Sequence, residues 1–189
     1  KWMDICYEDL KTGKFPKYKD NIKKIVSDFK KVPIEKKELP KVGIVGEILV
    51  KYHVFANDDL IGKLEREGAE ASLPDLMGFV KYCCYNAIIK NKMLKTGGWN
   101  AFFNQQALNI IDIIEKPAKD ALKGTRYHSV TNIYELAKNV EGILSLGNQT
   151  GEGWFLTSEM VSLIKHGVSN IICVQPFACL PNHIVGKRD

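Results

Sequence analysis

Two cysteines and a histidine lie close together near the C-terminal end of the sequence. Cys173 and Cys179 are separated by five residues, and His183 follows four positions later. The segment begins where the apolar run 168–173 ends, and such a run is typical of a buried parallel strand. Loops at the carboxyl ends of strands carry much of the chemistry of α/β proteins, so this segment is the first candidate site.

Thiolates are soft ligands that suit iron–sulfur clusters, but this spacing is not that of a zinc finger or a ferredoxin. Two thiolates do not complete a four-coordinate site, so a further ligand must come from elsewhere. The candidates are Cys6, Cys83, Cys84 or a cysteine outside this sequence. In the alternative interpretation both cysteines are buried, inert packing residues. His183 is open to three interpretations: a metal ligand, a proton donor or a loop histidine without a role.

A glycine-rich segment, 147–153, is the second candidate. We expect a strand before it and a helix after it, so its backbone N–H groups, with the helix dipole behind them, can bind an anion such as phosphate. Its glycine spacing is not that of a Rossmann fingerprint or a P-loop, so nucleotide binding is not indicated. Alternatively, it is a tight turn in which Thr150 or Glu152 caps the helix. The candidate anion- or substrate-binding residues are Gly147, Asn148, Thr150, Gly151, Glu152 and Gly153.

Glu47 is the third candidate, because it interrupts the apolar, β-branched run 41–50. An ionised carboxylate in a core is costly unless a partner satisfies it, and Lys51 or a loop amide can do so. Glu47 then either faces the site or caps a neighbouring helix, and both interpretations stay open. Glu47 and His183 therefore join the candidate substrate-binding residues.

Alternating strand and helix patterns position these three segments. The predicted strands are 41–50, 69–73, 142–146 and 168–174. The predicted helices are 18–31, 57–68, 133–140 and 154–166, with a long helical stretch over 76–122 that is broken at 96–98 and at 116–117. This alternation predicts an α/β fold: a doubly wound, mainly parallel sheet flanked by helices, with a helical insertion. We expect residues 1–40 to form an N-terminal helix and linker, and residues 41–189 to form the α/β domain.

The composition excludes several classes of protein. The 189 residues are 45% hydrophobic and 26% charged, as in globular domains that bury a core, and the sequence has no apolar run long enough to span a bilayer. The net charge of +5 comes mainly from lysines between Lys11 and Lys41. That pattern is typical of a solvated helix or linker, so nucleic acid is not an expected partner.

Cysteine usage indicates the compartment. The five cysteines are an odd number and no secretory signal precedes them, which favours a reducing cytoplasm over a disulfide framework. The sequence contains no nucleophile–base triad, zinc-protease helix or Walker motif, so we do not expect it to be a hydrolase or an ATPase on its own. Both ends are those expected of a piece cut from a longer polypeptide.

Three segments together resemble a known family. They are Val42-Gly-Ile-Val-Gly-Glu-Ile48, Gly147-Asn-Gln-Thr-Gly-Glu-Gly-Trp-Phe-Leu156 and Cys173-Val-Gln-Pro-Phe-Ala-Cys-Leu-Pro-Asn-His-Ile-Val-Gly-Lys187. In order and separation they resemble the dehydratase-like region of large activator proteins of 2-hydroxyacyl-CoA dehydratase, also described as CoA enzyme activases, from anaerobic bacteria. The resemblance runs from about Cys6 to Lys187.

The resemblance implies an α/β protein that holds an iron–sulfur cluster through cysteines. Carried over residue by residue, it makes Cys173 and Cys179 cluster ligands, with Cys6 as a weaker third, and it makes 147–153 a wall of the cluster or an anion site. It implies two partners: an ATPase activase module, in cis or in trans, and an acyl-CoA. Further family cysteines would lie before Lys1, and the family's ATPase part is absent from this sequence.

The leading interpretation is therefore an iron–sulfur-cluster-binding domain of a 2-hydroxyacyl-CoA dehydratase or activase-type protein, acting in ATP-linked, low-potential electron transfer. Such a domain is part of a dehydratase or reductase system, and whether the chain is itself an enzyme stays open. One alternative is a non-enzymatic interaction module. Another is a metal-free domain that binds an anion or coenzyme A.

Overall fold

The computed structural model describes residues 1–13, 17–35 and 37–186. The chain divides into two units. Unit 1 comprises Lys1–Lys36 and Ala107–Val130, and unit 2 comprises Lys37–Gln106 and Thr131–Asp189.

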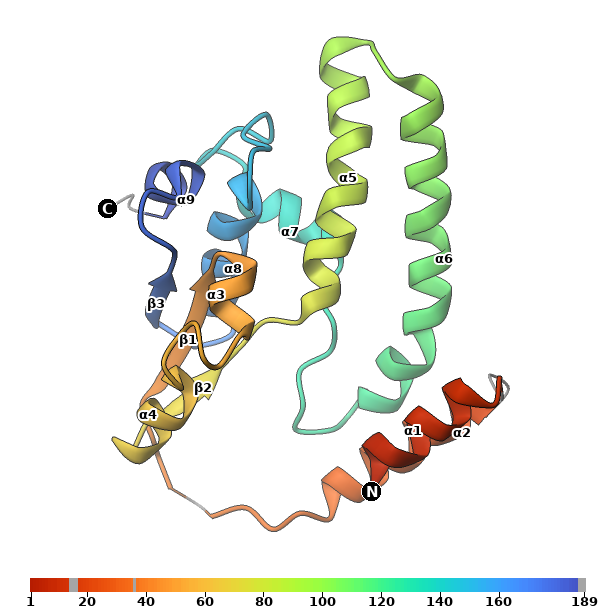
Figure 1. Ribbon diagram of the computed structural model, residues 1–189, viewed down its shortest axis with the longest axis vertical. Helices are drawn as coiled ribbons and strands as arrows, with labels where there is room; N and C mark the ends of the chain where they lie inside the picture. Colours follow the sequence, from red (N-terminus) through yellow and green to blue (C-terminus); the bar gives the residue numbers. More distant parts are fainter. Residues whose placement is uncertain (14–16, 36, 187–189) are drawn as a thin grey trace. The chain divides into compact units, whose positions relative to one another are not determined.

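Unit 2 is built on a parallel sheet of three strands, β1 (Lys41–Gly46), β2 (Glu70–Ser72) and β3 (Asn170–Val174). The strand order is β2-β1-β3, and β1 pairs in parallel with both neighbours (Figure 1). Helices flank this sheet, which confirms the predicted α/β fold.

Both faces of the central strand are buried. Ile44 and Val45, which point to opposite faces, are 1% and 0% exposed. Gly43 allows helix α8 (Gly153–Lys165) to approach closely, because a Cβ at this position would lie 2.7 Å from Leu163 Cδ1. This burial explains the near-continuous apolar sequence of β1.

The remaining helices of unit 2 are α3 (Ile48–Tyr52), α4 (Leu60–Arg66), α5 (Leu76–Leu94), the first part of α6 (Gly98–Leu122), α7 (Ile133–Asn139) and α9 (Leu180–Val185). Trp154 and Phe155, at the start of α8, pack with Tyr82 of α5 into an aromatic core. The Trp154 indole N–H also donates to Asn86 Oδ1 at 2.9 Å, so α5 and α8 are joined by packing and by a partly buried hydrogen bond.

Unit 1 contains α1 (Trp2–Lys11), α2 (Tyr18–Lys30) and the remainder of α6. The carboxylate of Asp28 on α2 accepts hydrogen bonds from the Lys1 ammonium at 2.9 Å and from the Trp2 indole N–H at 3.1 Å. Helix α2 confirms the predicted helix 18–31, whereas α1 was not predicted.

Three predicted boundaries are wrong, each for a local reason. The first strand ends at Gly46 rather than at residue 50, because Gly46 has a φ of +134° and Glu47 caps a short helix that begins at Ile48. Residues 142–146 form turns rather than a strand, since the N–H groups of Ile143 and Leu144 both donate to Val140 O. Helix α6 continues through Pro117, whereas the break at 96–98 is confirmed.

Two ion pairs in α6 join residues on either side of Pro117. The Lys119 ammonium lies 3.0 Å from Asp112 Oδ1 and 3.0 Å from Glu115 Oε2, so it ties the turns on either side of Pro117 together. This pairing offsets part of the cost of the hydrogen bond that proline cannot make. Among the described residues no helix has the length and apolarity to cross a membrane.

Candidate functional site

The three segments singled out in the sequence meet at the carboxyl end of β1 and β3. The Glu47 N–H donates to Val174 O at 2.9 Å, and the Ile48 N–H donates to Glu152 Oε1 at 3.0 Å. A Cβ at Gly151 would lie 3.2 Å from Pro181 Cβ, so the glycine-rich turn touches the loop after β3. We call this region the switch-point site and define it as Glu47, residues 147–153 and residues 173–183.

Its position follows from the strand order. From β1 the chain leaves towards β2 on one side of the sheet, whereas β3 lies on the other side. In parallel α/β sheets such a reversal opens a crevice beyond the carboxyl ends of the two strands, and ligands bind there. The sheet therefore places the predicted candidates of unit 2 at the edge where parallel α/β sheets generally bind ligands.

Both Glu47 and Glu152 bind the N-terminus of α3. Glu47 is the N-cap, and its Oε2 accepts from the Val50 N–H at 2.9 Å. Glu152, only 4% exposed, reaches the same helix end through its bond to Ile48 N–H. Glu47 thus caps a helix, which is the second of its two interpretations, and it does so at the edge of the site. The positive end of α3 is thus occupied by two carboxylates of the chain itself.

The glycine-rich turn is held largely by its own groups. The N–H groups of Gly147 and Asn148 donate to Ser145, and the Trp154 N–H donates to Asn148 O at 2.8 Å. The Tyr82 hydroxyl donates to the carbonyls of Gln149 and Gly151. Gly153, with φ +45°, lies so close to Asn148 O that a Cβ would be 2.0 Å from it. These contacts fix the turn that bears Thr150, which is exposed.

A buried ion pair lies beneath the site and was not predicted from the sequence. The Lys51 ammonium donates to both carboxylate oxygens of Glu159, each at 2.9 Å, and the two side chains are 2% and 3% exposed. Lys51 thus pairs with Glu159 on α8 rather than with Glu47. One feature of the sequence could have indicated this pair. Glu159 is the single acid in the otherwise apolar sequence of α8, and burying its carboxylate is as costly as burying that of Glu47.

Burial raises the pKa of Glu159 to about 7, against the attraction of Lys51. Because the folded protein then holds this proton at pH values where the unfolded chain has lost it, stability falls as the pH rises. We expect the free energy of unfolding of the wild type to decrease between about pH 4.5 and pH 7, relative to that of Glu159→Gln. Urea unfolding of both proteins across this range measures the effect. Parallel pH profiles of the two proteins would contradict it.

Cys173 and Cys179 lie on the loop side of the site, and both are half-buried. The Cys173 sulfur is packed tightly, since a Cβ at Gly186 would lie 3.0 Å from it. Burial raises the pKa of the Cys173 thiol, and the carboxylates of Glu152 and Glu159 raise it further. Cys179 is the N-cap of α9. The His183 ring is exposed, and its Nδ1 lies 2.8 Å from Gln175 Nε2.

The described residues do not build a complete metal site. They contain no group of three or more His, Cys, Asp or Glu side chains placed to hold a metal ion. Cys83 and Cys84 lie on α5, and Cys6 lies in unit 1, where it lines an apolar pocket. The switch-point site therefore offers two thiols, and an iron–sulfur cluster held by four protein ligands needs two more.

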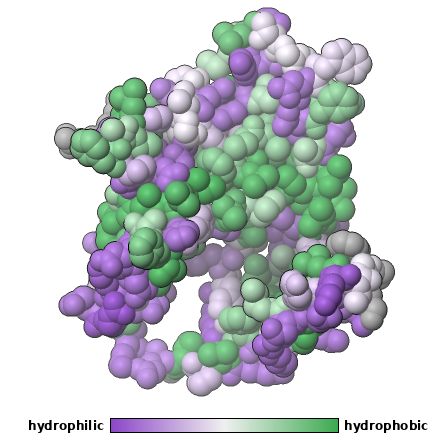
Figure 2. All heavy atoms as spheres, in the orientation of Figure 1, coloured by the Kyte–Doolittle hydropathy of each residue, from purple (hydrophilic) through white to green (hydrophobic). Residues whose placement is uncertain are grey.

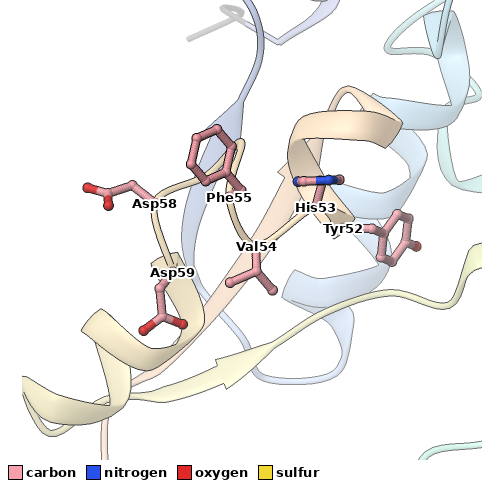
Figure 3. Close-up of a pocket in the computed structure, with 6 residues that line it drawn as sticks. All are labelled: Tyr52, His53, Val54, Phe55, Asp58 and Asp59. Carbon is pink, nitrogen blue, oxygen red and sulfur yellow. The ribbon is translucent and has the colours of Figure 1, made fainter.

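A separate open pocket lies beside the segment that follows α3. It has a volume of about 690 Å³ and is lined by Tyr52, His53, Val54, Phe55, Asp58 and Asp59 (Figure 3). Its two carboxylates are paired, Asp58 with Lys63 and Asp59 with Arg66. Because each carboxylate already has a cationic partner, neither indicates a metal site or a catalytic acid in this pocket.

Comparison with known proteins finds no relative of this chain. Neither the protein-family models, nor the curated proteins, nor the solved structures include a match to this chain.

Proposed function

We propose that unit 2 is the iron–sulfur-cluster-binding, dehydratase-like domain of a 2-hydroxyacyl-CoA dehydratase or activase-type protein. The observation that carries the proposal is the meeting of three segments that lie far apart in the sequence. Each of the segments that resemble the family contributes to the switch-point site, through Glu47, Glu152 and the loop of Cys173. One ligand could therefore contact all three segments, as the proposal requires.

In this proposal Cys173 and Cys179 are two of the cluster ligands. The other ligands would be cysteines outside this sequence, because the switch-point site itself supplies only two thiols. A bound cluster would supply one-electron transfer at low potential. In the described part of the chain, the charged side chains that act on Cys173 are the buried carboxylates of Glu152 and Glu159 and the cation of Lys51. This excess of negative charge favours a low potential.

The proposed role is electron relay in an ATP-linked system. The chain's partners would be an ATPase activase module and an acyl-CoA substrate, and both follow from the resemblance alone. Electron paramagnetic resonance of the dithionite-reduced protein, purified without oxygen, tests the role. We expect a cluster signal in the wild type and in Cys83→Ser, and its loss in Cys173→Ser and in Cys179→Ser. A signal that survives in both loop variants would contradict the proposal.

A second candidate, a docking module, is favoured by the exposed apolar side chains around the same loop. Phe177, Leu180 and Ile184 are 102%, 67% and 62% exposed. Figure 2 shows further hydrophobic areas on the face that it draws. If the chain only docks an activase or a dehydratase, binding of that partner should survive the loss of both loop cysteines and fail in Phe177→Ser.

A further inference from the structure

Three aromatic side chains gather at the turn between α5 and α6. Trp99, Phe102 and Phe103 are 79%, 53% and 64% exposed. The ring centroid of Phe103 lies 5.7 Å from that of Phe102 and 6.4 Å from that of Trp99, so the rings form one cluster. We call residues 92–103 the aromatic tip. It belongs to unit 2 and includes the end of α5 that lies farther from the sheet (Figure 1).

The aromatic tip is exposed over nearly its whole length. Of its residues only Ala101 is buried, and Met93 and Leu94, the last two residues of α5, are 54% and 62% exposed. Single exposed apolar side chains are common on protein surfaces, but a patch of adjacent ones marks an interaction surface. The aromatic tip therefore needs a partner that buries its apolar side chains.

Hydrogen bonds fix the turn that carries the rings. The Lys95 N–H donates to Asn91 O at 2.8 Å, and Asn91 Nδ2 donates to Thr96 O at 2.9 Å. The Ala101 N–H donates to Gly97 O at 2.9 Å, so α6 begins directly after the turn. Because this backbone is already ordered, little conformational entropy is lost there when the rings contact a partner.

The charged residues of this stretch of sequence are all lysines. Lys90, Lys92 and Lys95 are exposed, and the sequence has no Asp or Glu from residue 76 to residue 111. The rings are thus accompanied by cations, whereas surfaces that bind other proteins are depleted in lysine. A partner that buries the rings and attracts these lysines must be both apolar and anionic.

We propose that the aromatic tip binds the surface of a bilayer that contains anionic lipids. Trp, Phe and Leu side chains insert at the boundary between headgroups and acyl chains, and lysines beside them are attracted to anionic headgroups. The aromatic tip is too short to span the bilayer, so the contact is with one leaflet only. The proposal rests on unit 2 and does not depend on a bound cluster.

Sedimentation with lipid vesicles tests the role of the aromatic side chains. The wild type should bind vesicles of phosphatidylcholine that contain about 30% phosphatidylserine. Trp99→Ser/Phe103→Ser should weaken this binding by about tenfold or more, because two rings are no longer buried in the lipid. Phe55→Ser is the matched control: Phe55 is 91% exposed but lies outside the aromatic tip, so binding should be unchanged. Absence of binding by the wild type, or equal binding by Trp99→Ser/Phe103→Ser, would overturn the proposal.

A matched pair of charge variants tests the role of the lysines. Lys92→Gln/Lys95→Gln should weaken binding to the same vesicles by about tenfold or more. Lys23→Gln/Lys24→Gln removes the same charge from exposed positions of α2 and should have little effect. Equal losses in the two variants would overturn the proposal, because they would mean that net charge, rather than the aromatic tip, determines binding.

Tryptophan fluorescence locates the contact on the protein. In the variant Trp2→Phe the remaining indoles are those of Trp99 and of Trp154, which is 0% exposed. Saturating phosphatidylserine-containing vesicles should shift the emission to shorter wavelength, because the Trp99 indole leaves water for the lipid interface. An unchanged emission spectrum would overturn the proposal.

A single-stranded oligonucleotide is the competing probe, because exposed rings beside lysines also stack on bases. Binding of the oligonucleotide without binding of vesicles would overturn the proposal and assign the aromatic tip to nucleic acid. Loss of the cluster signal in Cys173→Ser bears only on the proposed function, so the two claims can fail separately.

Discussion

Replacing Lys51 with methionine is expected to lower the free energy of unfolding by about 3–5 kcal/mol at pH 8. The substitution keeps the length of the side chain but removes the only cation that contacts the buried carboxylate of Glu159 in the described structure, where both oxygens lie 2.9 Å from the Lys51 ammonium. Glu159 must then stay ionised without a partner or take up a proton, and both cost free energy in the core. Urea unfolding measures the loss.

Two controls separate this effect from a general loss of packing. The double variant Lys51→Met/Glu159→Leu should recover most of the stability, because an apolar pair of similar volume often replaces a buried ion pair at little cost. Lys63→Met removes the partner of exposed Asp58 and should leave the free energy of unfolding nearly unchanged. A double variant as unstable as Lys51→Met would show that the pair is not the cause.

Gly46→Ala is expected to destabilise unit 2 by more than about 2 kcal/mol and to disturb the switch-point site. A Cβ at Gly46 would lie 1.8 Å from Val174 O, so β1 and β3 would have to separate at their carboxyl ends. The φ of +134° adds strain for any residue with a side chain. The loss should appear in urea unfolding and, if the cluster is held there, in its occupancy.

Gly142→Ala is the matched control for this prediction. Gly142 also has a positive φ, +79°, but a Cβ there would meet no atom within 4 Å. Gly142→Ala should therefore lower the free energy of unfolding only through backbone strain, by about 1 kcal/mol. Equal losses in the two variants would mean that the close approach of β1 to β3 does not matter.

Local patterns predicted most of the secondary structure of unit 2. The strand at 170–174 and the helices at 133–139 and 153–165 lie within two residues of their predicted bounds. The first strand was predicted too long because the residues after Glu47, Ile-Leu-Val, are apolar and β-branched in part, and such short runs fit a strand as well as a buried helix. Only Glu47 as the N-cap of α3 distinguishes the two.

The site was predictable in position but not in detail. Parallel strands bring the segments that follow them to one edge, so the order of β1 and β3 places Glu47 near the loop of Cys173. The glycine-rich turn follows no strand in the described structure, and its place at this edge depends on how α8 packs on β1. The pairing of Lys51 with Glu159 joins residues 108 positions apart, and no local pattern encodes it.

The content of iron and acid-labile sulfide in protein purified without oxygen tests the central claim most directly. It should be determined for the wild type, Cys173→Ser, Cys179→Ser and the control Cys83→Ser, whose thiol is exposed on α5. We predict stoichiometric iron and sulfide in the wild type and the control, and their loss in both loop variants. Folded, colourless wild-type protein without iron, or loop variants with full iron content, would contradict the account.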